Sequence, residues 1–388
     1  MSTIRVNTIQ STSTTDGGIS IDSSGHVTLD GQNLPSAGPL SNRNLIINGA
    51  MQVAQRGTSV TGVTTSGHRT VDRFRPSMGT LGTWTIEQST DAPDGFAYSH
   101  KFTCTTADAS PAANDDIECE YKVEAQDLQH LNYGSSTAQD MTLSFWVKSN
   151  KTGTATVNIL QIDNSNKSLS PTYTISSAGV WEHKTIFIPG DTAGVINNDN
   201  GLGLYFAWWL NSGSTYTSGT NRTTWTTFSS ADRNASNLGV GGAVNDYWQI
   251  TGVQLEVGSV ATPFEHRSYG DELARCRRYY QRFTATSPST ATATCSAFMY
   301  TSTAVIGVFQ SQVQMRAIPT LDSSSGTNHY GIFRNGTYDS FNSVSISSTC
   351  SENCFVFANT TEVSGTAGQA GWLFLDISTA YLGFSAEL

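Results

Sequence analysis

Charged side chains are scarce in this sequence, and basic side chains are the scarcer kind. Only 13% of the 388 residues are charged, below the roughly 25% of ordinary soluble domains, and 31 Asp and Glu stand against 21 Lys and Arg. The formal net charge of -10 argues against a dedicated nucleic-acid binder, because such proteins present a basic face to the phosphates. A surface rich in Ser, Thr, Asn and Gly is instead typical of extracellular β-structures and rigid assemblies.

Long apolar runs are also missing. No run of about 18 apolar residues occurs, so we expect no membrane insertion. The stretch 1–18 has no continuous apolar core, so we expect no secretory signal peptide. The six cysteines are too sparse for a disulfide framework. An extracellular kind of composition without an export signal is ordinary for a virus whose particles leave the host cell by lysis.

Aromatic side chains are absent from the N-terminal part of the chain, since none precedes Phe74. Apolar residues alternate at 19–21 and at 27–29 around the polar turn 23–25, which predicts a β-hairpin. With so few apolar side chains, the arm 1–40 does not bury enough surface to offset its ordering entropy as a monomer. We therefore expect this arm to be disordered, intertwined with copies of the same chain, or docked on a partner.

The region 41–267 contains a long series of short β-like segments with turn signals between them, which predicts a two-sheet sandwich. In 116–124, one face is apolar and is formed by Ile117, Cys119, Tyr121 and Val123. In 247–257, apolar residues alternate with Gln254 and Glu256, so we expect one buried face and one wet face.

Paired carboxylates would be needed by an enzyme that hydrolyses polysaccharides. Glu118 and Glu120 share one face of a predicted strand, but Lys122 shares it too, and Glu is usually exposed. We therefore predict that this face is solvated and that the two carboxylates are not catalytic.

One segment has a convincing helical pattern. Ser268 is a suitable N-cap, and Asp271 and Glu272 suit the positive N-terminal dipole. A narrow seam of the coiled-coil kind is formed by Tyr269, Leu273, Cys276 and Tyr280. We predict a helical connector over 268–284, which is short enough to need packing against flanking domains or against symmetry copies. The pattern of 285–388 predicts a small C-terminal β domain.

Several stretches carry a resemblance to a known group of proteins. They are residues 44–57, 72–74, 142–149, 248–281, 313–322 and 380–388. Together they resemble the tail-fibre and related virion structural proteins of tailed bacteriophages. The resemblance covers nearly the whole chain beyond residue 40, and its most specific part is 254–267.

The resemblance implies a mainly β protein in which 41–267 is an antiparallel jelly-roll β-sandwich of the carbohydrate-binding-module kind. It also implies a non-enzymatic homotrimer in the virion, without fixing which virion component it is. Of these components we expect a receptor-binding tail fibre, which serves in host attachment and recognises host-surface glycans. The arm 1–40 would attach to other virion proteins. Two alternatives are a capsid decoration (cement) protein and a polysaccharide-degrading tailspike; the sequence lacks the long strand-length repeat that builds a β-helix.

Metal and cofactor motifs are not evident in the sequence. The seven histidines are dispersed, and no pair has a helical or finger spacing. Cys350 and Cys354 have no second pair, so a role as small hydrophobic residues is favoured over a zinc site. We expect no cofactor. A structural calcium ion held by loop Asp residues and carbonyl groups stays open, as in many jelly rolls of the resembled group.

Aromatic residues are the remaining candidates for a binding site. Sugars stack on flat aromatic faces and accept or donate hydrogen bonds at their rims. Trp146 and Trp209 lie opposite the core face of their strands, and a polar loop follows the second of them. The candidate glycan-binding residues are therefore Trp146, Trp209, Tyr216, Asn221, Arg222 and Trp225. The alternative is that these rings fill the second sheet or a contact between subunits.

Overall fold

The computed structural model describes residues 8–10, 18–29, 32–163, 166–285 and 291–388. It confirms a mainly β protein with antiparallel sheets and few helices. The chain divides into two compact units, Met1–Tyr269 and Gly270–Leu388. Within the described ranges, every helix is too short or too polar to cross a membrane.

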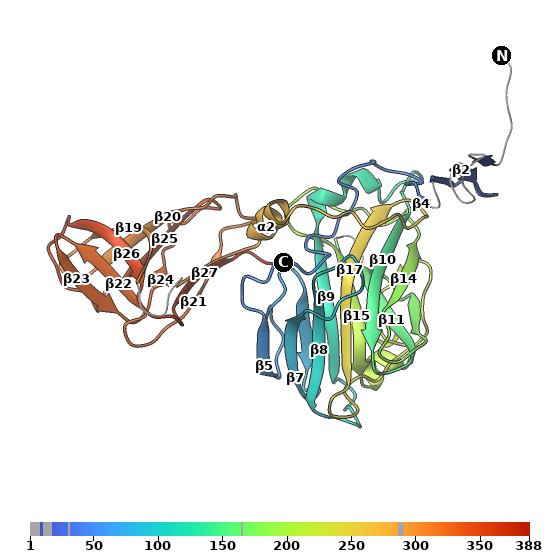
Figure 1. Cartoon of the computed structure of the whole chain (residues 1–388), viewed down its shortest axis with the longest axis horizontal. Coiled ribbons are helices and arrows are strands. Elements are labelled where there is room, and N and C mark those ends of the chain that lie inside the picture. The colour runs from blue at the N-terminus through green and yellow to red at the C-terminus, as the bar shows by residue number, and fades with distance from the viewer. Residues whose placement is uncertain (1–7, 11–17, 30–31, 164–165, 286–290) are drawn as a thin grey trace, which may run out of the picture. The chain divides into compact units, whose positions relative to one another are not determined.

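The larger unit contains a sandwich of two sheets. The first sheet has the order β14 (Glu182–Ile188), β10 (Met141–Ser149), β17 (Tyr247–Val257), β8 (Ser99–Thr106), β7 (Thr83–Ser89) and β5 (Ser59–Val63). The second has the order β16 (Thr226–Thr227), β12 (Lys167–Leu169), β11 (Gly153–Gln161), β15 (Leu202–Ser212), β9 (Asp116–Glu124) and β6 (Arg75–Gly79), and β13 (Thr172–Ile175) also pairs with β11. The short helical turns are η1 (Ala125–Leu131), α1 (Ser214–Thr217) and η2 (Ser230–Asp232). Figure 1 shows the strands side by side, with β17 in yellow next to β10 in green.

The core of the larger unit lies between the inner faces of the two sheets. The predicted apolar face of β9 is buried there. Large aromatic side chains of both sheets are also fully buried: Trp84, Phe102, Phe145, Phe206, Trp208 and Trp248. Each such side chain contributes about 1.5–3 kcal/mol through burial. This core holds the strands in register, and the outer faces of the sheets are left for other contacts.

The described part of the N-terminal arm forms a small antiparallel sheet of β1 (Thr8–Gln10), β2 (Gly18–Ile21), β3 (Val27–Leu29) and β4 (Gln32–Asn33). The predicted hairpin is confirmed, because Ile19 pairs with Leu29 and Ile21 with Val27. Among the described residues before 41, no apolar side chain is buried. The association of this arm with copies of the chain or with other virion proteins stays a prediction.

The smaller unit has two antiparallel sheets around one core. The seven-stranded sheet has the order β23 (Thr337–Phe341), β22 (Tyr330–Arg334), β26 (Ala370–Leu375), β19 (Thr292–Met299), β20 (Val305–Gln310), β25 (Cys354–Asn359) and β24 (Ser345–Ile346). The three-stranded sheet has the order β18 (Tyr280–Thr284), β27 (Tyr381–Ser385) and β21 (Thr320–Ser323). Side chains such as Tyr330, Phe355, Phe357 and Phe384 are buried between them.

The helix α2 spans Tyr269–Arg277, so the prediction of a helix over 268–284 is wrong in its second half. Tyr280–Thr284 forms β18 instead and pairs with β27 at all five residues. Helix propensity is a weak preference, and main-chain pairing with a neighbouring strand overrides it here. Tyr280 therefore leaves the predicted seam of Tyr269, Leu273, Cys276 and Tyr280, and its hydroxyl donates to Asp322 Oδ2 at 2.7 Å.

Candidate functional site

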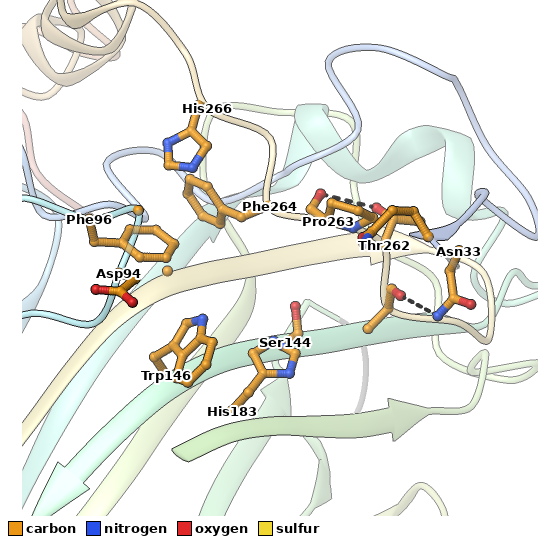
Figure 2. A pocket seen from close by; sticks show the side chains of 14 residues that line it. Asn33, Asp94, Phe96, Ser144, Trp146, His183, Thr262, Pro263, Phe264 and His266 are labelled. Atoms are coloured by element: carbon orange, nitrogen blue, oxygen red, sulfur yellow. Dashed lines mark hydrogen bonds between the residues drawn. The ribbon is translucent and has the colours of Figure 1, made fainter. Parts of the chain in front are cut away.

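The outer face of the first sheet carries a pocket of about 410 Å³. Its floor comes from three neighbouring strands, with Ser144 and Trp146 on β10, His183 on β14 and Gly252 on β17. Trp146 and His183 are directly opposite each other in the strand pairing, and their ring centroids are 5.2 Å apart. Figure 2 shows these two rings along one side of the hollow, with Phe264 and His266 on the other side.

A β-bulge in β17 makes room on this floor. The pairing of β10 with β17 shifts between Ser144 and Trp146, because β17 contains one more residue there. Gly252 lies at the bulge with a φ of 59°, a conformation that glycine adopts at little cost. A Cβ atom on Gly252 would lie 2.7 Å from Phe96 Cζ and 3.0 Å from Trp146 Cδ1. The absence of a side chain lets both aromatic rings lie against the strand.

One wall of the pocket comes from the loop 90–98, which connects β7 to β8 and supplies Asp94, Gly95 and Phe96. The N–H of Phe96 donates to the carbonyl of Pro93 at 3.1 Å, which closes a tight turn. The Phe96 ring centroid lies 5.0 Å from that of Phe264 and 5.3 Å from that of His266. The two sides of the pocket therefore meet in an aromatic cluster.

The other wall is the segment 261–266, which folds back across the outer face of β17. The N–H and hydroxyl of Thr262 donate to the Glu256 carboxylate at 2.9 and 2.7 Å, and the N–H of Glu265 donates to Gln254 Oε1 at 2.8 Å. Gln254 and Glu256 are buried beneath this segment, so the prediction of a wet face on β17 is wrong. Their polar groups are instead satisfied by the chain that forms the wall.

The end of the pocket is formed by Gln32 and Asn33 of the N-terminal arm. The Asn33 amide donates from Nδ2 to the carbonyl of Ala261 at 3.0 Å, which joins this end to the second wall (Figure 2). Side chains from four distant parts of the larger unit thus surround one cavity.

The chemistry of the pocket is aromatic and nearly uncharged. Its fourteen lining residues include five aromatic or imidazole rings, of which Trp146 and His183 form a pair and the other three form a cluster. The lining also contains hydroxyl and amide groups, one carboxylate on Asp94 and no Lys or Arg. Burial lowers the pKa of His183, and the charge of Lys184 lowers it further. His183 is therefore a neutral ring near pH 7, with one nitrogen that donates and one that accepts hydrogen bonds.

Of the six sequence-predicted binding residues, Trp146 lines this pocket. Asn221 is bonded within its own loop region, where Nδ2 donates to the Ser170 carbonyl at 3.0 Å. Arg222 donates from Nε to Asp232 at 2.9 Å. The Trp225 indole donates to the carbonyl of Pro189 at 2.7 Å and packs against the core. The polar groups of these three residues serve the fold in the described structure, and glycan contacts by them stay a prediction.

Trp209 and Tyr216 come together on the outer face of the second sheet. Their ring centroids are 5.0 Å apart, and Arg233 Cζ lies 4.7 Å from the Trp209 centroid. Trp209 is completely buried, while Trp146 on the first sheet is partly exposed. Trp209 therefore follows the alternative in which the ring fills a covered sheet face.

The same covered face holds Glu118 and Glu120, and the prediction that they are solvated is wrong. Their side chains are only 3% and 6% exposed. The hydroxyl of Tyr205 lies 2.7 Å from Glu118 Oε1 and 2.9 Å from Glu120 Oε1. Arg233 lies 3.4 Å from Glu118, and Arg75 bonds to Glu120. The segment that carries Arg233 covers this face of the sheet. The alternation of residues within β9 does not indicate that another segment covers it.

The pKa values of these two carboxyl groups are shifted in opposite directions. Burial raises the pKa of Glu118 to about 8, against the attraction of Arg233. Burial also opposes ionisation of Glu120, but the charge of Arg75 and its hydrogen bond lower the pKa of that group overall. A hydroxyl has one proton and can donate to only one carboxylate. The second contact of Tyr205 is satisfied when Glu118 is protonated and donates to the hydroxyl oxygen.

Sequence reasoning found Trp146 but missed His183, Gly252, Phe96 and Phe264 as pocket residues. One signal was available for Gly252, because the apolar residues of β17 change phase between Ile250 and Val253. A phase change beside a glycine indicates a bulge. Nothing in the local pattern of 90–98 indicates that this loop crosses the sheet.

Cysteines and acidic residues form no evident metal centre. None of the six cysteines, all of which lie in the described ranges, forms a disulfide, and Cys350 is buried while Cys354 is partly exposed. No group of three or more His, Cys, Asp or Glu side chains suited to a metal ion occurs within the described residues. A structural calcium ion stays an untested expectation.

Comparison with known proteins gives distant structural similarities. No protein-family model matches the chain, and no curated protein matches it either. The enzymatically active domain of bacteriophage CBA120 tailspike protein 4 aligns with 55% of this chain at 12% identity and a TM-score of 0.30, and this chain covers 21% of that tailspike.

Two smaller structures are covered almost completely by this chain. A protein from Bacteroides thetaiotaomicron named for sugar binding aligns with 56% of this chain and 100% of its own length, at 12% identity and a TM-score of 0.32. The family 11 carbohydrate-binding module from Clostridium thermocellum, in complex with a mixed-linked tetrasaccharide, aligns with 53% of this chain and 98% of its own, at 10% identity and a TM-score of 0.27. Similarities this distant assign no ligand to the pocket.

Proposed function

We propose that this chain is a non-catalytic, glycan-binding structural protein of a bacteriophage virion. In this proposal, the pocket on the outer face of the first sheet binds an uncharged sugar of a host-surface glycan. The single observation that carries the proposal is the pocket itself, in which Trp146, Phe96 and Phe264 surround a cavity of about 410 Å³.

Aromatic rings with polar neighbours suit a sugar ring, which has an apolar C–H face and a hydroxyl rim. The hydroxyl of Ser144, the amides of Gln32 and Asn33, and the neutral ring of His183 line the same cavity. Cavities that bind small molecules are typically about 300–1,000 Å³. The lining offers no cation for an acidic sugar, and Asp94 would repel one, so an uncharged sugar fits better.

A binding role is favoured over hydrolysis by the number of carboxylates. Most glycoside hydrolases use two carboxyl groups on either side of the bond that is cleaved. The pocket lining contains one, Asp94. The buried pair Glu118 and Glu120 is held by Tyr205, Arg233 and Arg75 on the opposite sheet.

The place of the protein in the virion is proposed from the sequence. The resemblance of 254–267 and the other matching stretches to tail-fibre and related virion proteins supports a homotrimeric virion component, which we propose to be a tail fibre and not a capsid decoration protein. The lack of buried apolar side chains in the described arm supports association with copies or with other virion proteins. Light scattering of the purified full chain should give a trimer, and antibody labelling of intact particles should mark the tail. A monomer at micromolar concentration would contradict the proposed trimer, and labelling of the head would contradict the proposed location in the tail.

Glycan binding is tested with the Trp146→Ala variant. We expect the full chain to bind neutral members of an array of bacterial surface glycans, and the variant to lose at least about tenfold in affinity by calorimetry, because one stacking face is removed. The matched control is Phe187→Ala, since Phe187 is an exposed aromatic residue on the same strand as His183 but does not line the pocket.

Three outcomes would count against the proposal. They are an absence of binding to every glycan, a preference for acidic glycans, and an equal loss of affinity in the Phe187→Ala control. The appearance of shortened products after incubation with host capsule or lipopolysaccharide would favour the tailspike alternative.

A further inference from the structure

Asp91 connects the loop 90–98 to three strands of the first sheet. Its carboxylate accepts hydrogen bonds from Lys148 Nζ at 3.0 and 2.7 Å, from Trp181 Nε1 at 3.1 Å and from Gln249 Nε2 at 2.8 Å. These donors come from β10, from the residue before β14, and from β17. One side chain thus joins the loop to a polar row across the sheet.

This polar row lies next to the floor of the pocket. Lys148 pairs with Gln249 across β10 and β17, and two residues further along β10, Trp146 pairs with His183 and with a residue of β17. Residues two apart on a strand point to the same face. The carboxylate of Asp91 is therefore anchored on the same outer face as Trp146, one row away from the ligand pocket.

From this anchor the loop leads directly into the first wall. A turn between Pro93 and Phe96 follows Asp91, and the Phe96 ring lies close to Gly252, which Trp146 also approaches. Asp94 lines the pocket from the same turn. Only a few residues of chain separate Asp91 from these two side chains, so the position of the anchor limits where they can lie.

We propose that Asp91 is a positioning residue of the glycan site, which sets affinity and selectivity by holding Phe96 and Asp94 against the pocket without contacting the sugar. This inference rests on the proposed function and deepens it. Its specific claim is that Asp91, which lies outside the pocket lining, fixes the position of the wall that carries Asp94 and Phe96 and that sets selectivity.

The anchor is exposed enough to be removed without unfolding the sandwich. The Asp91 side chain is 42% exposed, and its three donors, of which Gln249 is buried, lie outside the hydrophobic core cluster. Partial burial opposes ionisation, but the hydrogen bonds from Lys148, Gln249 and Trp181 lower the pKa of Asp91 overall. The hydroxyl of Ser99 donates to the main-chain carbonyl of Asp91 at 2.6 Å and stays in place in any side-chain variant.

The first test is the Asp91→Ala variant of the full chain. We expect the thermal unfolding midpoint to change little, the amide hydrogen exchange of 90–98 to become faster, and the affinity for the strongest neutral glycan of the array to fall about tenfold. Discrimination against uronic-acid glycans should also weaken, because Asp94 loses its fixed place. Asp108→Ala is the matched control, since Asp108 bonds a loop N–H at 3.0 Å and does not line the pocket.

The second test separates positioning from a general structural effect. If Asp91 acts through Phe96, then Asp91→Ala should weaken glycan binding in the wild-type background and have little further effect in a Phe96→Ala background. Additive losses in the double variant, or unchanged exchange in 90–98, would overturn the inference. These outcomes differ from failure of the proposed function, in which the unchanged chain binds no glycan while the exchange experiment still reports on the anchor.

Discussion

The outer faces of the two sheets in the larger unit share a strand pattern but differ in how far they are exposed. On each sheet a tryptophan points away from the core, Trp146 on β10 and Trp209 on β15. Trp146 is partly exposed and lines a pocket, whereas Trp209 is completely buried. The strand pattern determines which face a ring occupies, and the loops determine whether that face stays open.

The segments that lie over the two outer faces differ in how much of each face they cover. The second sheet is covered by a segment that brings Tyr216 and Arg233 onto the Trp209 ring. The first sheet is crossed by 90–98 and by 261–266, which leave a cavity between them. On the covered face the Trp209 ring is packed against Tyr216 and Arg233, whereas the rings between the two walls of the first sheet line an open cavity. This contrast supports a structural role for Trp209 and the binding role that we propose for Trp146.

The largest expected effect concerns Trp209. Replacement of this residue by Ala should lower the free energy of unfolding of the larger unit by about 3–5 kcal/mol, because it leaves a cavity beneath Arg233. Urea denaturation followed by tryptophan fluorescence measures it, since every tryptophan except Trp372 lies in this unit. Trp209→Phe should lose less, and Trp146→Ala should stay within about 1 kcal/mol of the wild type. Equal losses at Trp209 and Trp146 would remove the distinction between the two faces.

The next effect is a pH dependence that belongs to the covered face. The pKa of Glu118 is raised from 4.5 to about 8 in the folded chain. The folded state therefore holds a proton that the unfolded state has lost, so the stabilising contribution is complete below pH 4.5 and is lost as the pH rises to about 8. Glu118→Gln should flatten this slope, so that the loss of unfolding free energy between pH 4.5 and about 8 is smaller in the variant by about 1–3 kcal/mol.

His100 provides a check on this measurement, because its effect has the opposite sign. Burial lowers the pKa of His100 from 6.5 to about 3, so stability is lost as the pH falls below 6.5. The stabilities of wild type and Glu118→Gln should therefore diverge between pH 4.5 and about 8, and both proteins should share the loss caused by His100 below pH 6.5. Parallel curves across the whole range would show that Glu118 is not protonated in the fold.

The sequence predicts the inward-facing side of the sandwich well. Alternation in 116–124 identifies the buried residues of β9 correctly, since core burial follows from a period of two. It does not predict the burial of Glu118, because the charge of Arg233 that accompanies that carboxyl group lies more than a hundred residues away in the chain. The helical pattern of 268–284 fails for a related reason, because pairing with β27 determines the structure of Tyr280–Thr284.

The candidate binding site is harder to predict than the fold, because two of its parts depend on long-range contacts. Trp146 is recognisable from its strand, whereas Phe96 and Phe264 enter the site only because Asp91, Gln254 and Glu256 hold their segments across the sheet. The local sequence of each segment gives no sign of these partners. The bulge at Gly252 is the exception, since the phase change in β17 is visible in the sequence.

The smallest expected change in stability, and the sharpest test of the open face, is Gly252→Ala. An alanine at a φ of 59° costs about 1–2 kcal/mol in any protein. Here its Cβ atom would also lie 2.7 Å from Phe96 and 3.0 Å from Trp146, so the rings must move apart. We expect a modest loss of stability by urea denaturation and a loss of at least about tenfold in glycan affinity.

The matched control for this variant is Gly62→Ala on β5. Gly62 has a φ of 70°, so its substitution carries a similar backbone cost, but a Cβ atom there meets no atom within 4 Å. Both variants should therefore lose stability through the backbone, Gly252→Ala at least as much as Gly62→Ala, and only Gly252→Ala should lose affinity. Equal glycan binding by the two variants would show that the approach of Phe96 and Trp146 to Gly252 does not form the site. The open face of the first sheet would then be no better a candidate for glycan binding than the covered face of the second sheet.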